Sequence, residues 1–150
     1  EEYGINIGNY IKNYQFEDLI SKEKSSIYNL SHEKGFLLID FWGTWCEPCK
    51  EITPDIVLLN SEYSDKLNIL SIAYDKNQEK VEDYITSNNM NWNHLFIKGN
   101  AKNKIEKNKF IEGLRIESYP TFILIDSKYK IIFRGVGKDG LEEVKKIINQ

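Results

Sequence analysis

Cysteine, proline and glycine are scarce in this sequence, and a long apolar run is missing altogether. The 150 residues include 2 Cys, 3 Pro and 9 Gly. Two cysteines cannot build the multi-disulfide scaffold of small secreted domains, and so few prolines and glycines exclude a collagen-like or low-complexity chain. No apolar stretch approaches the roughly 20 residues that span a bilayer as a helix. These absences leave a globular chain with a hydrophobic core of its own.

A marked excess of one charge is also missing. Lys and Arg total 20 against 23 Asp and Glu, which gives a formal net charge of −3. Nucleic-acid-binding domains generally carry a strong basic surface, so the composition gives no support for that function. The first residues, Glu1-Glu2-Tyr3, do not resemble the basic and then apolar start of a signal peptide. An export segment or lipoprotein anchor, if the protein has one, is expected upstream of Glu1.

No internal repeat, Pro/Ser-rich linker or charge block divides the chain, which predicts one domain over residues 1–150. A hairpin is expected at about 14–30 and the core at about 35–150. The expected strands are Gln15–Ile20, Ser25–Leu30, Phe36–Trp42, Leu67–Tyr74, Trp92–Ile97, Thr121–Ile125 and Lys130–Phe133. Helices are expected from about Cys46 toward Tyr63, around Val81–Ile85, and from Asp139, where Glu142 would complete a capping box. This order predicts an α/β fold with a mixed central sheet and helices on both faces.

The two cysteines stand three positions apart, where a strand passes into a helix. Cys46 and Cys49 follow the apolar run Phe36–Trp42 after the short loop Gly43-Thr44-Trp45. Free N–H groups and the dipole at a helix N-terminus favour an anion, so we expect a lowered pKa for the Cys46 thiol. Cys49 is expected to be shielded one turn further in, and Pro48 suits an early helical position. The pattern predicts a dithiol that cycles with a disulfide, with Cys46 as the outer, reachable sulfur.

Other interpretations of the cysteine pair are weaker. A zinc site needs about four ligands, and the remaining candidates, His32 and His94, are distant in sequence. Covalent haem attachment requires His directly after the second Cys, but Lys50 stands there. A structural disulfide that closes so small a loop would add little stability. The zinc site and the structural disulfide stay open as alternatives, whereas haem attachment is excluded.

Two separated motifs resemble the thioredoxin superfamily. Residues 36–50 resemble its active-site strand and helix, and Ser118-Tyr119-Pro120-Thr121 resembles its cis-proline loop. The match narrows to one group within this superfamily because of three further features: Glu47-Pro48 between the cysteines, Pro54 in the helix and the N-terminal hairpin. With these features the chain resembles the extracytoplasmic thiol–disulfide oxidoreductases of the TlpA/ResA type, from Tyr14 to the C-terminus. The resemblance implies a thioredoxin fold with an N-terminal hairpin extension.

The resemblance also assigns roles to individual residues. Cys46 matches the attacking cysteine and Cys49 the resolving cysteine. Pro120 matches the cis-proline beside the disulfide, in a loop whose backbone pairs with an extended segment of the substrate protein; an ordinary trans proline is the alternative. No metal or cofactor is implied beyond the redox-active Cys46–Cys49 disulfide. The expected substrate-binding residues are Trp45, Glu47, Pro48, Tyr119 and Pro120.

Asp40 is the third expected catalytic residue. It lies six residues before Cys46, where thioredoxins carry a buried carboxylate, and its strand is otherwise apolar. Burial disfavours the anion, so we expect a raised pKa for Asp40. Such a carboxyl group could relay the proton of Cys49 through water. The alternative is an Asp at a strand edge with its carboxylate in water.

The chain departs from both relatives in its ionisable residues. TlpA/ResA-type proteins usually carry Glu three residues after the second Cys, where this chain has Ile52, and Glu51 would point about 100° away on a helix. In thioredoxins a lysine on the next strand is the partner of the buried carboxylate, but this chain has no lysine there and Ser71 falls near that position. Asp40 is therefore expected to supply the acid–base function by itself. Glu47 places a negative charge beside the thiolate, which predicts a reductant-leaning couple.

The predicted function is the reduction of disulfides in exported proteins, in the periplasm or cell envelope. By resemblance, electrons would come from a membrane thiol carrier, and the same resemblance implies a role in cytochrome c biogenesis. A monomer is expected. One alternative is a cytosolic thioredoxin-type reductant served by a flavin reductase. Another is a binding module on the same fold whose thiols are idle.

Overall fold

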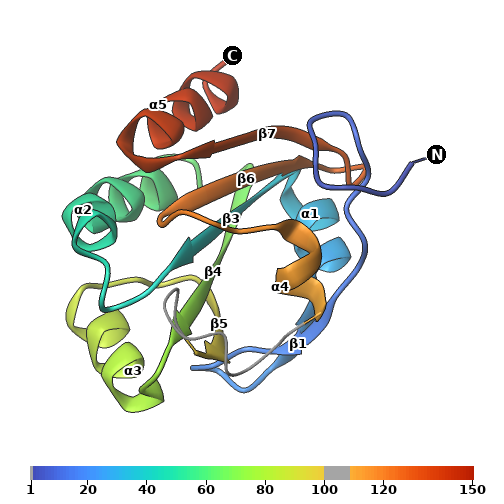
Figure 1. Cartoon of the computed structure of the whole chain (residues 1–150). Coiled ribbons are helices and arrows are strands. Elements are labelled where there is room, and N and C mark those ends of the chain that lie inside the picture. Colours follow the sequence, from blue (N-terminus) through green and yellow to red (C-terminus); the bar gives the residue numbers. More distant parts are fainter. Residues whose placement is uncertain (1, 100–108) are drawn as a thin grey trace.

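The computed structural model describes residues 2–99 and 109–150 (Figure 1). Its strands form one two-stranded and one five-stranded sheet. The strands are β1 (Gln15–Glu17), β2 (Lys24–Ser26), β3 (Phe36–Trp42), β4 (Leu67–Asp75), β5 (Asn93–Lys98), β6 (Thr121–Asp126) and β7 (Ile131–Val136). The helices are α1 (Ile27–Lys34), α2 (Glu47–Glu62), α3 (Gln78–Ser87), α4 (Lys109–Leu114) and α5 (Gly137–Ile148).

The large sheet is mixed, with the strand order β5-β4-β3-β6-β7. β3 and β5 pair in parallel with β4, whereas β6 pairs antiparallel with both β3 and β7. The central strand β3 is a nearly continuous apolar run because helices cover both faces of the sheet at its middle. The predicted α/β fold with a mixed central sheet is confirmed.

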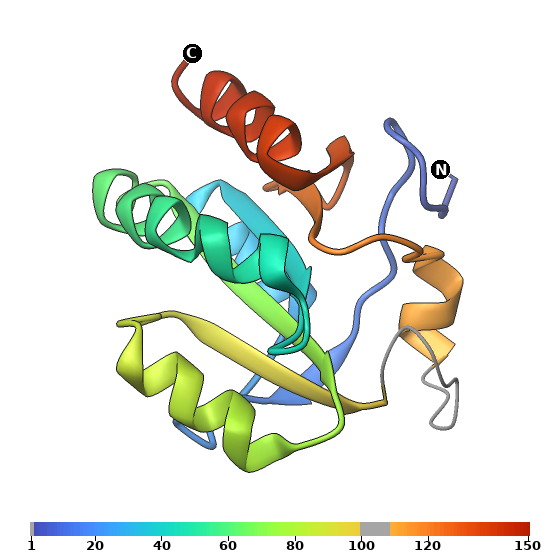
Figure 2. The same ribbon diagram turned by 60° about the vertical axis from the view of Figure 1, so that its left-hand side comes forward.

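Side chains of β3 alternate between the two faces of the sheet, as its two-residue period requires. Leu37, Ile39 and Phe41 join the core cluster that contains residues of α1 and α4. Leu38 joins the cluster built with α2 and α5, and Trp42 joins the cluster that contains both cysteines. Figures 1 and 2 show α2, α3 and α5 on one side of the sheet and α1 on the other.

The N-terminal region differs from the prediction. The hairpin exists, but its second strand ends at Ser26 and the helix α1 follows, so the expected strand Ser25–Leu30 is wrong over most of its length. Ser26 Oγ accepts a hydrogen bond from the N–H of Asn29 and so caps the helix. Ile27 and Leu30 then repeat at helical spacing and are buried. A serine N-cap with two apolar residues three positions apart was the signal that a strand interpretation missed.

The last helix begins two residues earlier than expected. Its first residue is Gly137, so Asp139 lies inside the first turn, and Val136 stands at the N-cap without a side-chain cap. The predicted capping box of Asp139 and Glu142 is therefore wrong. Gly137 has a φ of 65° and donates its N–H to Pro120 O at 3.0 Å. Glycine is suited to this positive φ and lets the chain turn directly into the helix.

None of the helices in residues 2–99 and 109–150 combines the length and apolar character that crossing a bilayer demands. The sequence predicts a solvated loop or helix face for the Lys-rich run 98–109, most of which falls outside the described residues.

Candidate functional site

The cysteine pair lies at the start of α2, after the loop that follows β3. Cys46 is the N-cap of α2, and Cys49 lies in its first turn and forms a disulfide with Cys46. The N–H of Cys49 donates to Cys46 Sγ at 3.2 Å. Pro48 occupies the first turn of the helix, where its missing N–H removes no helical hydrogen bond. One sulfur therefore sits at the positive end of a helix dipole and accepts a backbone N–H, which favours its thiolate form.

Cys46 is less accessible than the sequence suggests. Its exposed fraction is 4%, against 3% for Cys49, so the expectation of an outer, reachable sulfur is wrong for the disulfide form. Both cysteines belong to the buried cluster that includes Trp42, and the partly buried Tyr119 packs against this cluster. The reason is that Cys46 Sγ is bonded to Cys49 Sγ in the first turn of α2 and accepts the N–H of Cys49. The exposed residues at this point are the neighbours of the two cysteines in the chain.

Those neighbours form an exposed rim around the disulfide. Trp45 is 41% exposed, and Glu47 and Pro48 are exposed as well. Trp45 Nε1 donates to Tyr74 O at 2.8 Å, which fixes the indole over the end of β4. Glu47 pairs with Lys50 at 3.0 Å. A partner protein that approaches the disulfide would meet these side chains first.

The proline loop lies on the same edge of the sheet. Phe41 pairs with Thr121, so the residues before Thr121 lie beside the end of β3. The Tyr119–Pro120 peptide bond is cis, as the resemblance implies. The Tyr119 and Trp45 rings meet edge to face, with centroids 5.0 Å apart. The fold thus gathers the five expected substrate-binding residues around one disulfide.

Asp40 is buried in the middle of β3, with an exposed fraction of 2%. Burial raises its pKa to about 7, and a hydrogen bond from Ser71 Oγ to Asp40 Oδ2 at 2.8 Å offsets part of this effect. By the alternation of the strand, Asp40 faces the same side as Leu38 and Trp42. Leu38 packs against α2 and Trp42 against the cysteines. The carboxyl group therefore lies in the core under the start of α2, and not in water at a strand edge.

The two departures from the family pattern have a structural counterpart. Ile52 is buried in the apolar cluster beneath α2, and Glu51 is exposed. Ser71 pairs directly with Asp40 in the sheet, so a neutral hydroxyl occupies the place expected for a lysine. Neither Ile52 nor Ser71 brings a second charge to Asp40.

Asp75 is a site residue that the sequence analysis missed. It ends β4, is buried, and its Oδ2 accepts from Thr44 N at 2.6 Å and from Thr44 Oγ1 at 2.7 Å. Its Oδ1 accepts the N–H of Lys76 at 2.8 Å. The carboxylate thus ties the loop before Cys46 to the neighbouring strand. The only sequence signal was an Asp at the end of a buried strand, which does not reveal a partner 31 residues away.

Replacing Asp75 by Ala is expected to lower the free energy of unfolding by about 3 kcal/mol, because it leaves buried donors without an acceptor. Urea unfolding monitored by tryptophan fluorescence measures this loss. Asp126→Ala is the matched control, since Asp126 also ends a strand and accepts two backbone N–H groups but is only partly buried. Equal losses in the two variants would contradict the assigned role of Asp75.

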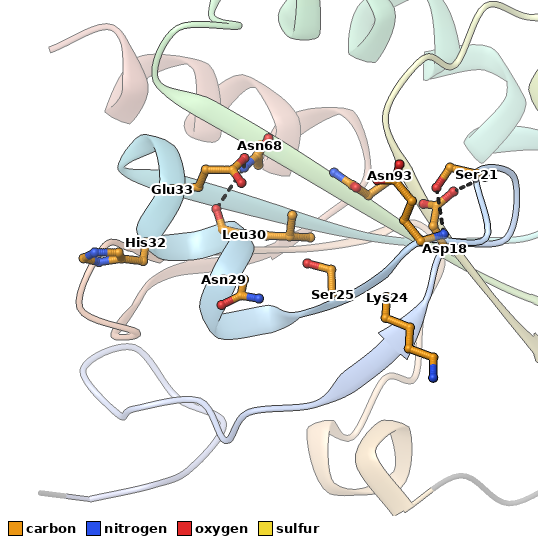
Figure 3. A pocket seen from close by; sticks show the side chains of 11 residues that line it. Asp18, Ser21, Lys24, Ser25, Asn29, Leu30, His32, Glu33, Asn68 and Asn93 are labelled. Atoms are coloured by element: carbon orange, nitrogen blue, oxygen red, sulfur yellow. Dashed lines mark hydrogen bonds between the residues drawn. The ribbon is translucent and has the colours of Figure 1, made fainter.

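A polar hollow of about 660 Å³ lies elsewhere, between the β1–β2 hairpin, α1 and the strands β4 and β5. Figure 3 shows Asn68 and Glu33 pointing toward one another at one end and Asp18 at the other. Asn68 Nδ2 donates to Glu33 Oε1 and Leu30 O, both at 3.0 Å. None of the predicted site residues lines this hollow. Within the described ranges, no three potential metal-ligating side chains gather.

Comparison with known proteins agrees with this geometry. The family model described as thioredoxin-like matches residues 35–131, well over half of the chain. The thioredoxin-like protein YneN of Bacillus subtilis is 28% identical over 131 residues, which cover 85% of this chain and 70% of YneN. Thioredoxin of the same organism is 40% identical over 65 residues, but these cover 43% of this chain and 62% of the thioredoxin.

Solved structures show the same fold. The thioredoxin domain of a thiol–disulfide oxidoreductase from Bacteroides vulgatus superposes with a TM-score of 0.79 at 22% identity, covering 97% of this chain and all of that domain. StoA from Bacillus subtilis gives a TM-score of 0.72 at 22% identity, with 93% and 97% covered. The resemblance to the TlpA/ResA type is supported by these matches and by YneN. The chain therefore belongs to the thioredoxin-like family, and its Cys46–Cys49 pair on this fold is that of a protein-disulfide oxidoreductase.

Proposed function

We propose that this protein reduces disulfide bonds in other proteins with the Cys46–Cys49 couple. The observation that carries the proposal is the disulfide at the start of α2, in which the N–H of Cys49 is directed at Cys46 Sγ. The same N–H would stabilise a Cys46 thiolate once the disulfide is opened. The exposed rim of Trp45, Glu47 and Pro48 offers a partner protein a contact surface beside this sulfur.

The reaction balances as two thiol–disulfide exchanges. The Cys46 thiolate attacks one sulfur of a substrate disulfide; that S–S bond breaks, and the other substrate sulfur leaves as a thiolate. Cys49 then gives its proton to Asp40 and attacks Cys46 Sγ, which releases the second substrate sulfur and closes the Cys46–Cys49 bond. Two electrons pass to the substrate. A donor dithiol afterwards reduces the Cys46–Cys49 disulfide and is itself oxidised to a disulfide.

A Cys49→Ser variant tests the order of attack. Without the second sulfur the mixed disulfide cannot resolve, so reduced Cys49→Ser protein mixed with oxidised insulin is expected to accumulate a covalent adduct. Non-reducing electrophoresis and mass spectrometry measure it, and the double variant Cys46→Ser/Cys49→Ser is the control that should form none. If the pair were idle in a binding module, Cys49→Ser would form no adduct and the proposal would fall.

The substrates, the electron donor and the compartment are finer parts of the same proposal. We propose that the substrates are exported proteins, that the donor is a membrane thiol carrier and that the protein is extracytoplasmic. This part of the proposal rests on the TlpA/ResA-type features Glu47-Pro48 and the N-terminal hairpin. Apocytochrome c, whose disulfide would be reduced to two thiols before haem attachment, is one substrate class that this resemblance suggests. Cell fractionation of the natural gene product tests the location, and its recovery only in the cytoplasm would contradict it.

A thioredoxin-type reductant of the cytoplasm is the second candidate, because the chain matches Bacillus subtilis thioredoxin at 40% identity over 65 residues. Such a protein accepts electrons from a soluble flavin reductase. NADPH oxidation by thioredoxin reductase in the presence of this protein and insulin distinguishes the two candidates. Rapid turnover favours the thioredoxin-type reductant, and turnover only with a chemical dithiol favours the envelope protein.

The couple is expected to have a reduction potential below about −150 mV, because Glu47 opposes the stabilisation of the neighbouring thiolate. Glu47→Gln is expected to raise the potential by only about 10–20 mV, since the carboxylate is exposed and paired with Lys50. Equilibration with glutathione measures both values. Glu51→Gln, an exposed charge on the same helix, is the control and should leave the potential unchanged. A wild-type value above −150 mV on this scale would refute the prediction.

A further inference from the structure

We propose that Arg134 is a positioning residue for the loop that carries Tyr119 and Pro120, and that through this loop it sets the affinity for a protein substrate. The loop, residues 115–120, connects α4 to β6 and is called the proline loop below. The link to substrate affinity rests on the proposed function. The contact between Arg134 and the loop lies within this chain and holds whatever the substrate is.

Two hydrogen bonds from one guanidinium group carry the argument. Arg134 lies on the edge strand β7, opposite Ile123 of β6. Its Nη2 donates to Arg115 O at 2.8 Å, and its Nη1 donates to Ile5 O at a longer 3.4 Å. The side chain thus joins β7 to the first residue of the proline loop and to the N-terminal segment. A guanidinium group is suited to this role because its N–H groups form a planar fork, whereas the ammonium group of lysine is a compact point charge.

The backbone at Arg115 shows why this contact matters. Arg115 directly follows α4 and has a φ of 53°, in the left-handed region that residues with a side chain rarely adopt. Such a conformation persists only where its surroundings hold it. The N–H of Arg115 donates to Glu112 O at 3.1 Å, and its carbonyl accepts from Arg134. An arginine side chain can supply the donor that carbonyl groups at a helix end lack, so Arg134 fixes the direction in which the chain leaves α4.

The other end of the proline loop is held without Arg134. Thr121 Oγ1 donates to Ser118 O at 2.5 Å, and the N–H of Gly137 donates to Pro120 O at 3.0 Å. Loss of the Arg134 side chain therefore releases the end of the loop next to α4 and leaves the end next to β6 in place. The expected consequence is a less ordered surface beside the disulfide, with the cysteine pair itself unchanged.

The guanidinium group is itself held in place. Arg134 is partly buried, and burial lowers its pKa from the ordinary value, while the charge of Glu117 on the proline loop acts in the opposite direction. Figure 1 shows the N-terminal segment beside β7, where the N–H of Gly8 donates to Ile131 O at 2.8 Å. This pairing fixes the segment that presents the Ile5 carbonyl. The second acceptor of Arg134 is therefore part of the sheet edge and not of a loose chain end.

Hydrogen exchange tests the contact without any turnover. Arg134→Met keeps an unbranched side chain but removes the fork, so amide exchange in residues 115–120 of the oxidised protein is expected to become about tenfold faster, with β3 unchanged. Arg134→Lys keeps the charge but not the fork and is expected to accelerate exchange about threefold. Mass spectrometry of peptides from the exchanged protein measures both. Unchanged exchange in the loop of Arg134→Met overturns the proposal, and so does an equal acceleration in β3, which would make Arg134 a general structural residue.

Steady-state kinetics test the effect on substrate binding. With insulin as substrate and dithiothreitol as donor, Arg134→Met is expected to raise KM about fivefold and to leave kcat within about twofold. Reduction of dithiobis(nitrobenzoate), a small disulfide that does not reach the proline loop, should keep its wild-type rate. An unchanged KM for insulin overturns the proposal. Slower reduction of the small disulfide also overturns it, because the effect of Arg134 would then lie at the cysteine pair.

Two variants separate the fork from a simple charge effect. Lys130 is a partly buried cation on the same edge whose Nζ lies over the ring of Tyr10, 5.5 Å from its centroid. Lys130→Met removes one charge and a contact to the N-terminal segment, and should change neither KM nor exchange in the loop. If Arg134 only attracted acidic substrates, Arg134→Lys would keep the wild-type KM or Lys130→Met would raise KM equally. Either result overturns the proposal.

Failure of this inference and failure of the proposed function give different results. If the wild-type protein did not reduce insulin, the proposed function would fall, while faster exchange in the loop of Arg134→Met would still establish the contact. If insulin reduction were normal and exchange in the loop of Arg134→Met were unchanged, only the role of Arg134 would be refuted.

Discussion

Replacing Cys46 by Ser is expected to abolish the catalysed reduction of insulin, with a loss of at least about 10³-fold in rate. A serine hydroxyl stays protonated near neutral pH, whereas the Cys46 sulfur lies at a helix N-terminus and accepts the N–H of Cys49. The helix can lower the pKa of a thiol into the range where it ionises, but not that of an alcohol. Turbidity of insulin in the presence of dithiothreitol measures the rate.

The comparison with Cys49→Ser makes this result specific. Both variants lose the disulfide, so any cost in stability from the missing bond is shared. Only Cys49→Ser keeps the attacking sulfur and should still form a mixed disulfide. Wild-type turnover in Cys46→Ser would show that Cys46 is not required. Adduct formation by Cys46→Ser but not by Cys49→Ser would reverse the roles assigned to the two residues.

Replacing Asp40 by Asn is expected to change stability and rate in opposite directions. Burial raises the pKa of Asp40 from 3.8 to about 7 in the folded protein. Between pH 4 and 7 the unfolded chain therefore loses this proton while the folded protein keeps it, and stability falls as the pH rises. The shift corresponds to about 4 kcal/mol by pH 8. Asn cannot ionise, so the free energy of unfolding of Asp40→Asn relative to the wild type should rise by about that amount between pH 4 and 8.

The rate should respond in the other sense. Below its pKa of about 7 Asp40 is neutral and cannot take the proton of Cys49, so resolution of the mixed disulfide should accelerate as the pH rises through this value. Asp40→Asn should lose that inflection and resolve about 10²-fold more slowly at pH 8. Urea unfolding and rapid-quench analysis of the mixed disulfide measure the two effects. Asp126→Asn, at a partly buried position at the end of β6, should change neither.

One result would separate the two effects of Asp40. If Asp40→Asn became more stable at high pH but resolved the mixed disulfide at the wild-type rate, the buried carboxyl would be established and its role in proton transfer refuted. If its stability relative to wild type did not vary with pH, the raised pKa itself would be contradicted.

The sequence determined the elements whose signal is local. The apolar run Phe36–Trp42 predicted a doubly covered strand, and the two cysteines after it predicted the start of a helix, both as found. For Asp40 the sequence predicted burial but left a strand edge in water as the alternative, and the structure shows that it is buried. These features depend on residues close together in the chain, where the periods of strands and helices leave little choice.

Tertiary structure alone decided which distant side chains meet. Asp40, Ser71 and Trp92 come from three separate segments, and only the register of β3, β4 and β5 brings them into one chain of hydrogen bonds. Tyr119 likewise reaches the cluster around the cysteines only because β6 pairs with β3 in the sheet, more than seventy residues along the chain from Cys46. Hydrogen bonds and burial depend on which residues are close in space. The periodicity of a sequence predicts single strands and helices, but it does not say which distant segments lie side by side after folding.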